Sequence, residues 1–206
     1  MKYILSLFIV VLSYGCFNAK RQYPDNFNAY NDSIDICIER FQQERDTSFI
    51  IKAIGYCDVL EEMLSDRKGR FAVIQKKCQL FGLIGEFRKA FLLQGKAVEL
   101  LDDNDVRRLE FYGLKYKCEG DTAMSSLYFN KAIAECDKDL SVRDNVTKKV
   151  ELLIMSGKKD EAKYTLKEYL KNHNDEDVRM MLDNFQLLCE EVSEGMLLLY
   201  GINLQK

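Results

Sequence analysis

The side chains that could carry out chemistry are few and stand far apart in the sequence. The chain has one histidine, His173, so no second histidine can share a metal ion or a proton with it. Two adjacent glutamate pairs occur, Glu61 with Glu62 and Glu190 with Glu191. Neighbouring residues on a helix point about 100° apart, so these pairs are expected to be solvated rather than acid–base partners. No nucleophile elbow, phosphate-binding glycine loop or zinc-ligand spacing is present. We expect no catalytic residue, no cofactor and no metal.

The first 15 residues have the pattern of an export signal. A single positive charge, Lys2, precedes an apolar run from Ile4 to Leu12, and the run ends shortly before Cys16. Crossing the hydrocarbon core of a bilayer takes about 20 apolar residues in a helix, so this run is too short to be a transmembrane anchor. We expect residues 1–15 to direct export and to be removed.

The segment Leu12–Cys16 has a glycine directly before the cysteine and resembles the lipobox of bacterial lipoproteins, although Leu12 lies one position farther from Cys16 than in the family pattern. The resemblance implies that Cys16 is acylated and anchors the protein in the bacterial cell envelope, at the outer membrane. Residues 16–30, which are polar and rich in asparagine, are then expected to form a flexible tether. The alternative is an ordinary cleaved signal and a periplasmic or secreted protein.

The other cysteines are better explained by packing than by reactivity. They contain no Cys-x2-Cys pair, and they stand at Cys37, Cys57, Cys78, Cys118, Cys136 and Cys189. Most take the places of apolar residues on helical stripes, where cysteine behaves as a small hydrophobic residue. We expect mostly buried free thiols. Disulfides are the alternative, because an even number of cysteines in an exported chain can pair.

The composition indicates a folded, all-helical protein. Its 206 residues include one proline and 11 glycines, too few for the many turns of an all-β fold. The net charge of -3 comes from interspersed acidic and basic residues, which offer no basic field to a nucleic-acid backbone. Nucleic acid is therefore not expected as a partner.

The clearest pattern lies between Leu109 and Ala132. Apolar or small residues recur at helical spacing on one side of a Gly120-Asp121 turn, at Leu109, Tyr112, Gly113 and Tyr116, and on the other side at Ser125, Phe129 and Ala132. This stretch resembles the tetratricopeptide repeat (TPR), whose first helix carries Trp-x2-Leu-Gly-x2-Tyr and whose second carries Ala-x3-Phe. The resemblance implies antiparallel helix hairpins that stack into a right-handed superhelix.

The same pattern can be followed along the chain. Hairpin turns are predicted at positions 45, 85, 120 and 157, which places four repeats at 31–65, 71–103, 106–138 and 143–174. Residues 176–206 are expected to cap the array, with one amphipathic helix over 178–191 covering its open end. The predicted architecture is one TPR-like domain, 31–206, made of helix hairpins with a C-terminal cap.

The first helices of the repeats also carry mostly polar residues opposite their apolar stripes, and we expect these to face outward. They are Gln75 and Gln79 in the second repeat, Arg107, Glu110, Leu114 and Lys117 in the third, and Lys148 and Glu151 in the fourth. In the TPR family the first helices line a concave surface, so stacking would join these eight residues into one partner-binding groove suited to an extended peptide. The alternative is an ordinary solvated face.

These features predict a binding scaffold rather than an enzyme. The leading hypothesis is an exported, lipid-anchored, TPR-like protein that binds a protein or peptide partner in the bacterial cell envelope. One alternative is an assembly or pilot factor for outer-membrane machinery, which co-purification with an outer-membrane barrel would favour. An enzyme of unknown type is the third.

Overall fold

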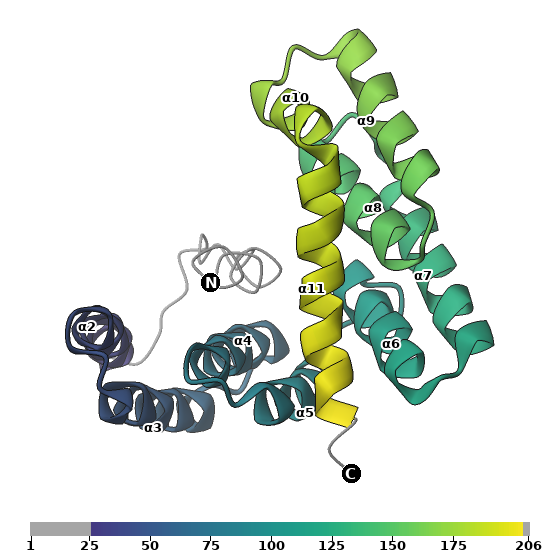
Figure 1. Ribbon diagram of the computed structural model, residues 1–206. Coiled ribbons are helices and arrows are strands. Elements are labelled where there is room, and N and C mark those ends of the chain that lie inside the picture. Colours follow the sequence, from purple (N-terminus) through teal and green to yellow (C-terminus); the bar gives the residue numbers. More distant parts are fainter. Residues whose placement is uncertain (1–25, 204–206) are drawn as a thin grey trace. The chain divides into compact units, whose positions relative to one another are not determined.

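The computed structural model describes residues 26–203, except for the side chains of residue 194 and residues 196–203. Within that range the chain forms ten α-helices and no strand (Figure 1). This confirms the all-helical fold class. The predicted signal segment 1–15 and the lipidation residue Cys16 lie outside the described residues. The helices are α2 (Phe27–Glu44), α3 (Thr47–Met63), α4 (Arg67–Leu83), α5 (Phe87–Val98), α6 (Val106–Glu119), α7 (Thr122–Cys136), α8 (Arg143–Met155), α9 (Lys159–Asn172), α10 (Glu176–Asp183) and α11 (Phe185–Asn203).

The chain divides into two compact units after Leu101. The first unit contains α2 to α5 and the second contains α6 to α11, and within each unit consecutive helices pack on one another. The prediction of a single domain over 31–206 is therefore replaced by two units, with the boundary between the second and third repeats.

Each predicted hairpin turn contains one residue in the left-handed backbone conformation. The φ angle is 58° at Arg45, 77° at Gly85, 81° at Gly120 and 85° at Gly157. Three of the four are glycine, which has no Cβ atom to clash in this conformation. A left-handed residue directly after the last helical turn reverses the chain. The four turn positions predicted from the sequence are thus confirmed, and each separates the two helices of one hairpin.

Aspartates define where several of these helices begin. The first backbone N–H groups of a helix lack intrahelical partners, and an aspartate at the preceding position can accept from them. Such caps occur at Asp46, Asp66, Asp105, Asp121 and Asp175. At the turn of the third hairpin, Met124 N donates to Asp121 Oδ1 at 3.0 Å, directly after the left-handed Gly120. The pair Gly120-Asp121 therefore ends one helix and starts the next.

The first unit packs its helices around an apolar cluster that includes the first residue of α2. Phe27 is 1% exposed and lies in this cluster with Ile34 and Ile50. The prediction of an unpacked tether over residues 16–30 is wrong for residues 27–30, because they are helical and Phe27 is buried. Phe27 stands between two asparagines, so its neighbours in the sequence give no sign that it is buried. Its packing partners lie farther along the chain.

In the second unit, α6 and α7 cross closely at Gly113. The ring of Phe129 fills the space above Gly113, so that a Cβ atom added at Gly113 would lie 2.8 Å from Phe129 Cδ1. Ser125 Oγ donates a hydrogen bond to the carbonyl oxygen of Gly113 at 2.9 Å. Small residues at such a crossing let the two backbones approach, and the buried hydroxyl satisfies its hydrogen-bonding need there.

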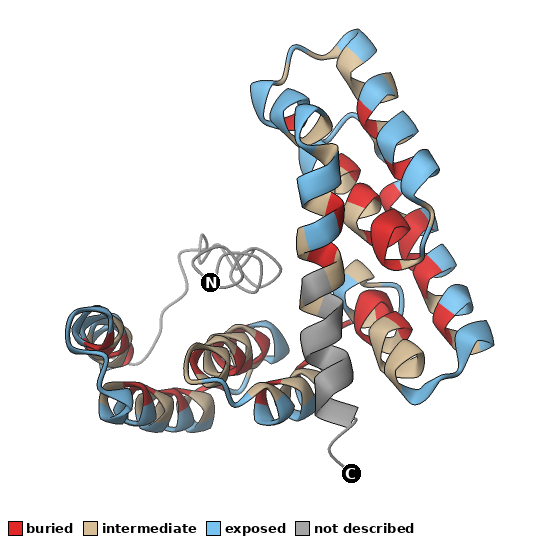
Figure 2. Cartoon of the chain, in the orientation of Figure 1, coloured by how far each residue is buried: buried red, intermediate tan, exposed pale blue. Residues whose placement is uncertain are grey.

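The helix α8 lies at the centre of the second unit. Its residues Leu152, Leu153, Ile154 and Met155 are buried in succession (Figure 2). Four successive residues point to all sides of a helix, so the last turn of α8 is enclosed by neighbours, and α8 packs against α7, α9 and α11. The sequence pattern at Val146, Val150 and Leu153 indicated only one apolar stripe.

The C-terminal region differs from the predicted cap. The expected single helix over 178–191 is interrupted at Asn184, which separates α10 from α11. The helix α10 packs on α9, while α11 packs against α8 and α6 (Figure 1). The prediction that this segment covers the open end of the array is therefore wrong for α11, which covers the first helices of the third and fourth hairpins instead.

Candidate functional site

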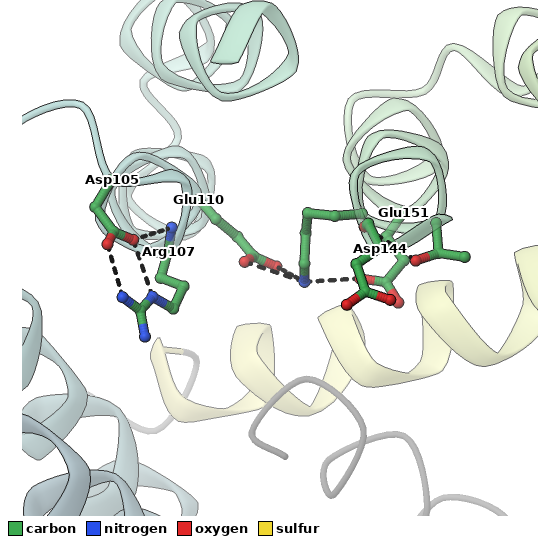
Figure 3. Close-up of polar contacts among 7 residues, drawn as sticks. Asp105, Arg107, Glu110, Asp144 and Glu151 are labelled. Carbon is green, nitrogen blue, oxygen red and sulfur yellow. Dashed lines mark hydrogen bonds and ion pairs between the residues drawn. The ribbon is translucent and has the colours of Figure 1, made fainter. Parts of the chain in front are cut away.

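The second unit joins three of the predicted groove residues in one buried ion cluster. Lys148 Nζ lies 2.7 Å from Glu151 Oε2 on the same helix and 3.4 Å from Glu110 Oε2 on α6 (Figure 3). Glu110 is 5% exposed, which contradicts the prediction that it faces outward. The side chains of Lys148 and Glu151 are 22% and 15% exposed. We call Glu110, Lys148 and Glu151 the ion triad.

The charges of the triad shift one another's proton affinity. Burial raises the pKa of Glu110, and repulsion from Glu151 adds to the rise while attraction to Lys148 opposes it. Burial alone would lower the pKa of Lys148, but attraction to the two carboxylates outweighs it and raises the pKa above its ordinary value. Lys148 is therefore protonated at neutral pH, where one ammonium group faces two carboxyl groups.

The remaining predicted groove residues of the second unit have different surroundings. Lys117 Nζ donates to the carbonyl oxygen of Met155, the last residue of α8, and partial burial lowers the pKa of Lys117. Leu114 is half-buried against the apolar core rather than facing solvent. Arg107 has a 44% exposed side chain and binds the carboxylate of Asp105 through two donors, at 2.9 and 2.7 Å (Figure 3). Of the six predicted groove residues on α6 and α8, Arg107 is exposed and the other five are buried or half-buried.

In the first unit, the two predicted groove residues on α4 are half-buried. Gln75 Nε2 donates to Gln94 Oε1 at 2.7 Å, which links α4 to α5 within the hairpin. The prediction that Gln75 faces outward is therefore wrong, since its amide is used between the two helices. Gln79, one turn later on α4, lies in the same unit. These two glutamines lie in the first unit, whereas the ion triad lies in the second.

The C-terminal helix α11 packs against the two helices that carry the predicted groove residues of the second unit. It passes beside the ion triad (Figure 3). Cys189 is 1% exposed and Val192 is 2% exposed, and both belong to the core cluster of the second unit. The sequence pattern did not predict that α11 packs on α6 and α8. The apolar spacing of residues 185, 188, 189 and 192 showed that the helix has a buried face, but not which surface that face meets.

The residues first considered for chemistry have packing or surface roles. The ring of His173 stacks on Tyr169 with centroids 4.1 Å apart, and its Nδ1 lies 3.0 Å from the carbonyl oxygen of Tyr169. In the described part of the chain, no group of three or more His, Cys, Asp or Glu side chains is placed to hold a metal ion. Glu61 pairs with Arg70 and Lys77 at 3.9 Å each, so it is not an acid–base partner of Glu62.

The cysteines from Cys37 onward are free thiols in the structure, and all except the half-buried Cys118 are buried. Burial raises the pKa of Cys57 and of Cys78 to about 12. It raises the pKa of Cys136 to about 11. Since the thiolate is the reactive form, these side chains are poor nucleophiles at neutral pH. They act as small core residues, as their spacing predicted.

Comparison with protein-family models, with curated proteins and with solved structures found no match to this chain. Among the helices that the structure describes, none combines the length and the apolar character needed to cross a membrane. The described residues combine helix hairpins in both units with an ion triad between α6 and α8 and a C-terminal helix packed on those two helices.

Proposed function

We propose that this protein is an exported, lipid-anchored scaffold that binds a protein or peptide partner in the bacterial cell envelope. The observation that supports the proposal best is the recurrence of one local design. Four helix hairpins follow each other, and each turns at a left-handed residue, at positions 45, 85, 120 and 157. Arrays of stacked helix pairs provide extended surfaces for binding. The proposal includes the TPR-like superhelix and the acylation of Cys16.

The proposed binding face in the second unit is formed by the first helices of the third and fourth hairpins, α6 and α8. Arg107 contributes an exposed guanidinium, whereas Lys117, Leu114 and the ion triad, on the same two helices, are half-buried or buried. Guanidinium and ammonium groups suit carboxylates and carbonyl oxygens of a peptide.

Membrane attachment through Cys16 is the first test. A Cys16→Ser variant is expected to take up no fatty-acid analogue in labelled cells and to move from the membrane pellet to the soluble fraction. Two acyl chains hold a protein on a bilayer, because each buried methylene contributes about 0.8 kcal/mol. Replacement of the half-buried Cys118 by serine is the matched control, and this variant should remain acylated. If Cys16→Ser still takes label and still pellets, the anchor is not at this residue.

Partner binding through the α6 face is the second test. Arg107→Glu is expected to reduce the amount of the captured envelope partner several-fold in a pull-down, because it replaces an exposed cation by an anion. The change also removes the ion pair of Arg107 with the N-cap residue Asp105, so Arg107→Gln, which loses this pair without adding a negative charge, is tested beside it, and circular dichroism checks the helix content of both variants. Reversal of the exposed Lys167 on α9 is the control. An unchanged set of captured proteins with Arg107→Glu would exclude Arg107 from the interface.

A further inference from the structure

Tyrosine rings gather where α6 and α7 pack on each other in the second unit. The ring centroid of Tyr128 on α7 lies 5.2 Å from that of Tyr112 and 5.5 Å from that of Tyr116 on α6, and the rings of Tyr116 and Tyr128 are stacked. All three residues are half-buried. Of the fifteen buried residues in the described core cluster of this unit, only Phe129 is aromatic. The tyrosines therefore lie at the margin of an aliphatic core.

Exposed side chains of α7 extend this group of rings. Leu127 is 44% exposed, and Lys131 is exposed as well. Lys131 follows Leu127 by four residues and Tyr128 by three, so the three side chains are neighbours on one face of the helix. We call Tyr112, Tyr116, Leu127 and Tyr128 the tyrosine patch. It lies on another side of α6 than the ion triad, because Tyr112 follows Glu110 by two residues, about 200° around the helix.

Two lysines hold their ammonium groups over the rings of the patch. Lys115 Nζ lies 5.7 Å from the ring centroid of Tyr112 and 5.8 Å from that of Tyr116. Lys131 Nζ lies 5.5 Å from the ring centroid of Tyr128. An ammonium group is attracted to the electron-rich face of an aromatic ring. This attraction keeps both positive charges beside the patch.

The charges of these two lysines are not balanced by nearby carboxylates. Glu119 and Glu135 each follow one of the lysines by four residues on the same helix. Within the described part of the chain, however, neither Lys115 nor Lys131 forms an ion pair, and Glu135 pairs with Lys138 instead. A partly apolar surface with cations at its margin is complementary to a partner that carries carboxylates around apolar side chains.

We propose that the tyrosine patch is a second docking surface and that its partner is an acidic peptide segment. Apolar side chains of the segment cover the rings, and its carboxylates pair with Lys115 and Lys131. Tyrosine suits such a surface because its ring is rigid and apolar, while its hydroxyl group donates hydrogen bonds to carboxylates. The inference rests on the proposed scaffold function and adds to it a surface on α6 and α7, separate from the proposed groove on α6 and α8.

Hydroxyl-radical footprinting of the intact full-length chain tests whether the patch is open to a partner. The rings of Tyr116 and Tyr128 are expected to be oxidised at least tenfold faster than the ring of Phe129, which is 1% exposed. Tyr164, which is 63% exposed, gives the rate of a freely accessible tyrosine. If Tyr116 and Tyr128 react as slowly as Phe129, the patch is covered in the intact chain and the proposal is overturned.

Binding to an array of short random peptides tests the class of partner. The wild-type chain is expected to bind acidic peptides at least tenfold more than basic ones. The double variant Lys115→Gln/Lys131→Gln is expected to lose at least tenfold of this signal. Glutamine removes the charge and is still favourable in a helix, so circular dichroism should show no loss of helix content. The matched control is the double variant Lys96→Gln/Lys167→Gln, since both of these lysines are exposed.

Equal binding of acidic and basic peptides would overturn the proposal, and so would a signal that the double variant at the patch retains. Footprinting of the wild-type chain is then repeated with an acidic peptide selected from the array and with a chitin oligosaccharide. The peptide is expected to protect Tyr116 and Tyr128 from oxidation but not Tyr164. Protection by the sugar alone would make the patch a carbohydrate site and would exclude an acidic peptide as its partner.

The patch and the groove fail in different experiments. If the array signal does not depend on Lys115 and Lys131 while Arg107→Glu still loses its partner in the pull-down, the scaffold function stands and the second surface falls. If the array signal depends on the two lysines but no envelope protein depends on Arg107, the tyrosine patch stands and the proposed groove contact is wrong.

Discussion

Replacing Lys148 with methionine is expected to lower the free energy of unfolding of the second unit by about 3 to 5 kcal/mol at pH 7, the typical result of removing one partner from a buried ion pair. Methionine keeps the length of the side chain but leaves Glu110 and Glu151 without the ammonium group that contacts both. The two carboxylates then repel each other in a site with little access to water. Urea denaturation followed by circular dichroism measures the change.

The loss of stability in Lys148→Met should depend on pH. Burial and repulsion from Glu151 already raise the pKa of Glu110, and loss of Lys148 raises it further. A carboxyl group whose pKa is higher in the folded than in the unfolded chain binds its proton more tightly when folded, so the folded state gains relative stability as pH falls through that pKa. The difference between Lys148→Met and the wild type is therefore expected to shrink between pH 7 and pH 5. If the loss of stability does not change with pH, the two carboxylates are not buried together.

Two control variants separate this effect from the loss of any lysine. Lys171→Met removes a solvent-exposed ion pair with Glu168 on α9 and is expected to leave unfolding unchanged. Glu110→Gln removes the most deeply buried charge but leaves Lys148 paired with Glu151 at 2.7 Å. Its stability is expected to stay within about 1 kcal/mol of the wild type, because the lost attraction is offset by the lost desolvation.

Replacing Gly113 with alanine is expected to lower the free energy of unfolding by about 1 to 3 kcal/mol, as overpacking of a core typically does. The added Cβ atom would lie 2.8 Å from Cδ1 and 2.9 Å from Cε1 of Phe129. Phe129 is 1% exposed and has no open space to move into. Separation of the helices would also strain the hydrogen bond from Ser125 to the Gly113 carbonyl. Gly113→Leu should be more severe, and thermal unfolding by circular dichroism measures both.

The same substitution at Gly55 provides the control for Gly113. Gly55 lies inside α3, and no atom stands within 4 Å of the position its Cβ would take. Gly55→Ala is expected to raise stability by about 0.5 to 1 kcal/mol, since alanine favours a helix more than glycine does. If Gly113→Ala proves as stabilising as Gly55→Ala, the two helices do not cross at Gly113 as the structure has them.

The sequence by itself determined the local design of the chain. Left-handed turns, aspartate caps and apolar spacing act within a few residues, so the four hairpins could be predicted from Arg45, Gly85, Gly120 and Gly157. The interlock of Gly113 with Phe129 could be predicted for the same reason, since one short turn joins their helices. The register of α6 and α8 also indicated that Glu110, Lys148 and Glu151 share the face opposite the apolar stripe.

Only the tertiary structure decided what covers that face. Apolar spacing shows that a helix has a surface to bury, but the spacing is the same whichever surface it meets. The position of α11 on α6 and α8, the burial of Glu110 and the enclosure of Leu152–Met155 in α8 depend on contacts between residues far apart in the chain. The pairing of Lys148 with Glu110, 38 residues away, and the division after Leu101 have the same origin. A periodic pattern does not predict such pairings. Each depends on the complementarity of two surfaces that meet only when the chain folds.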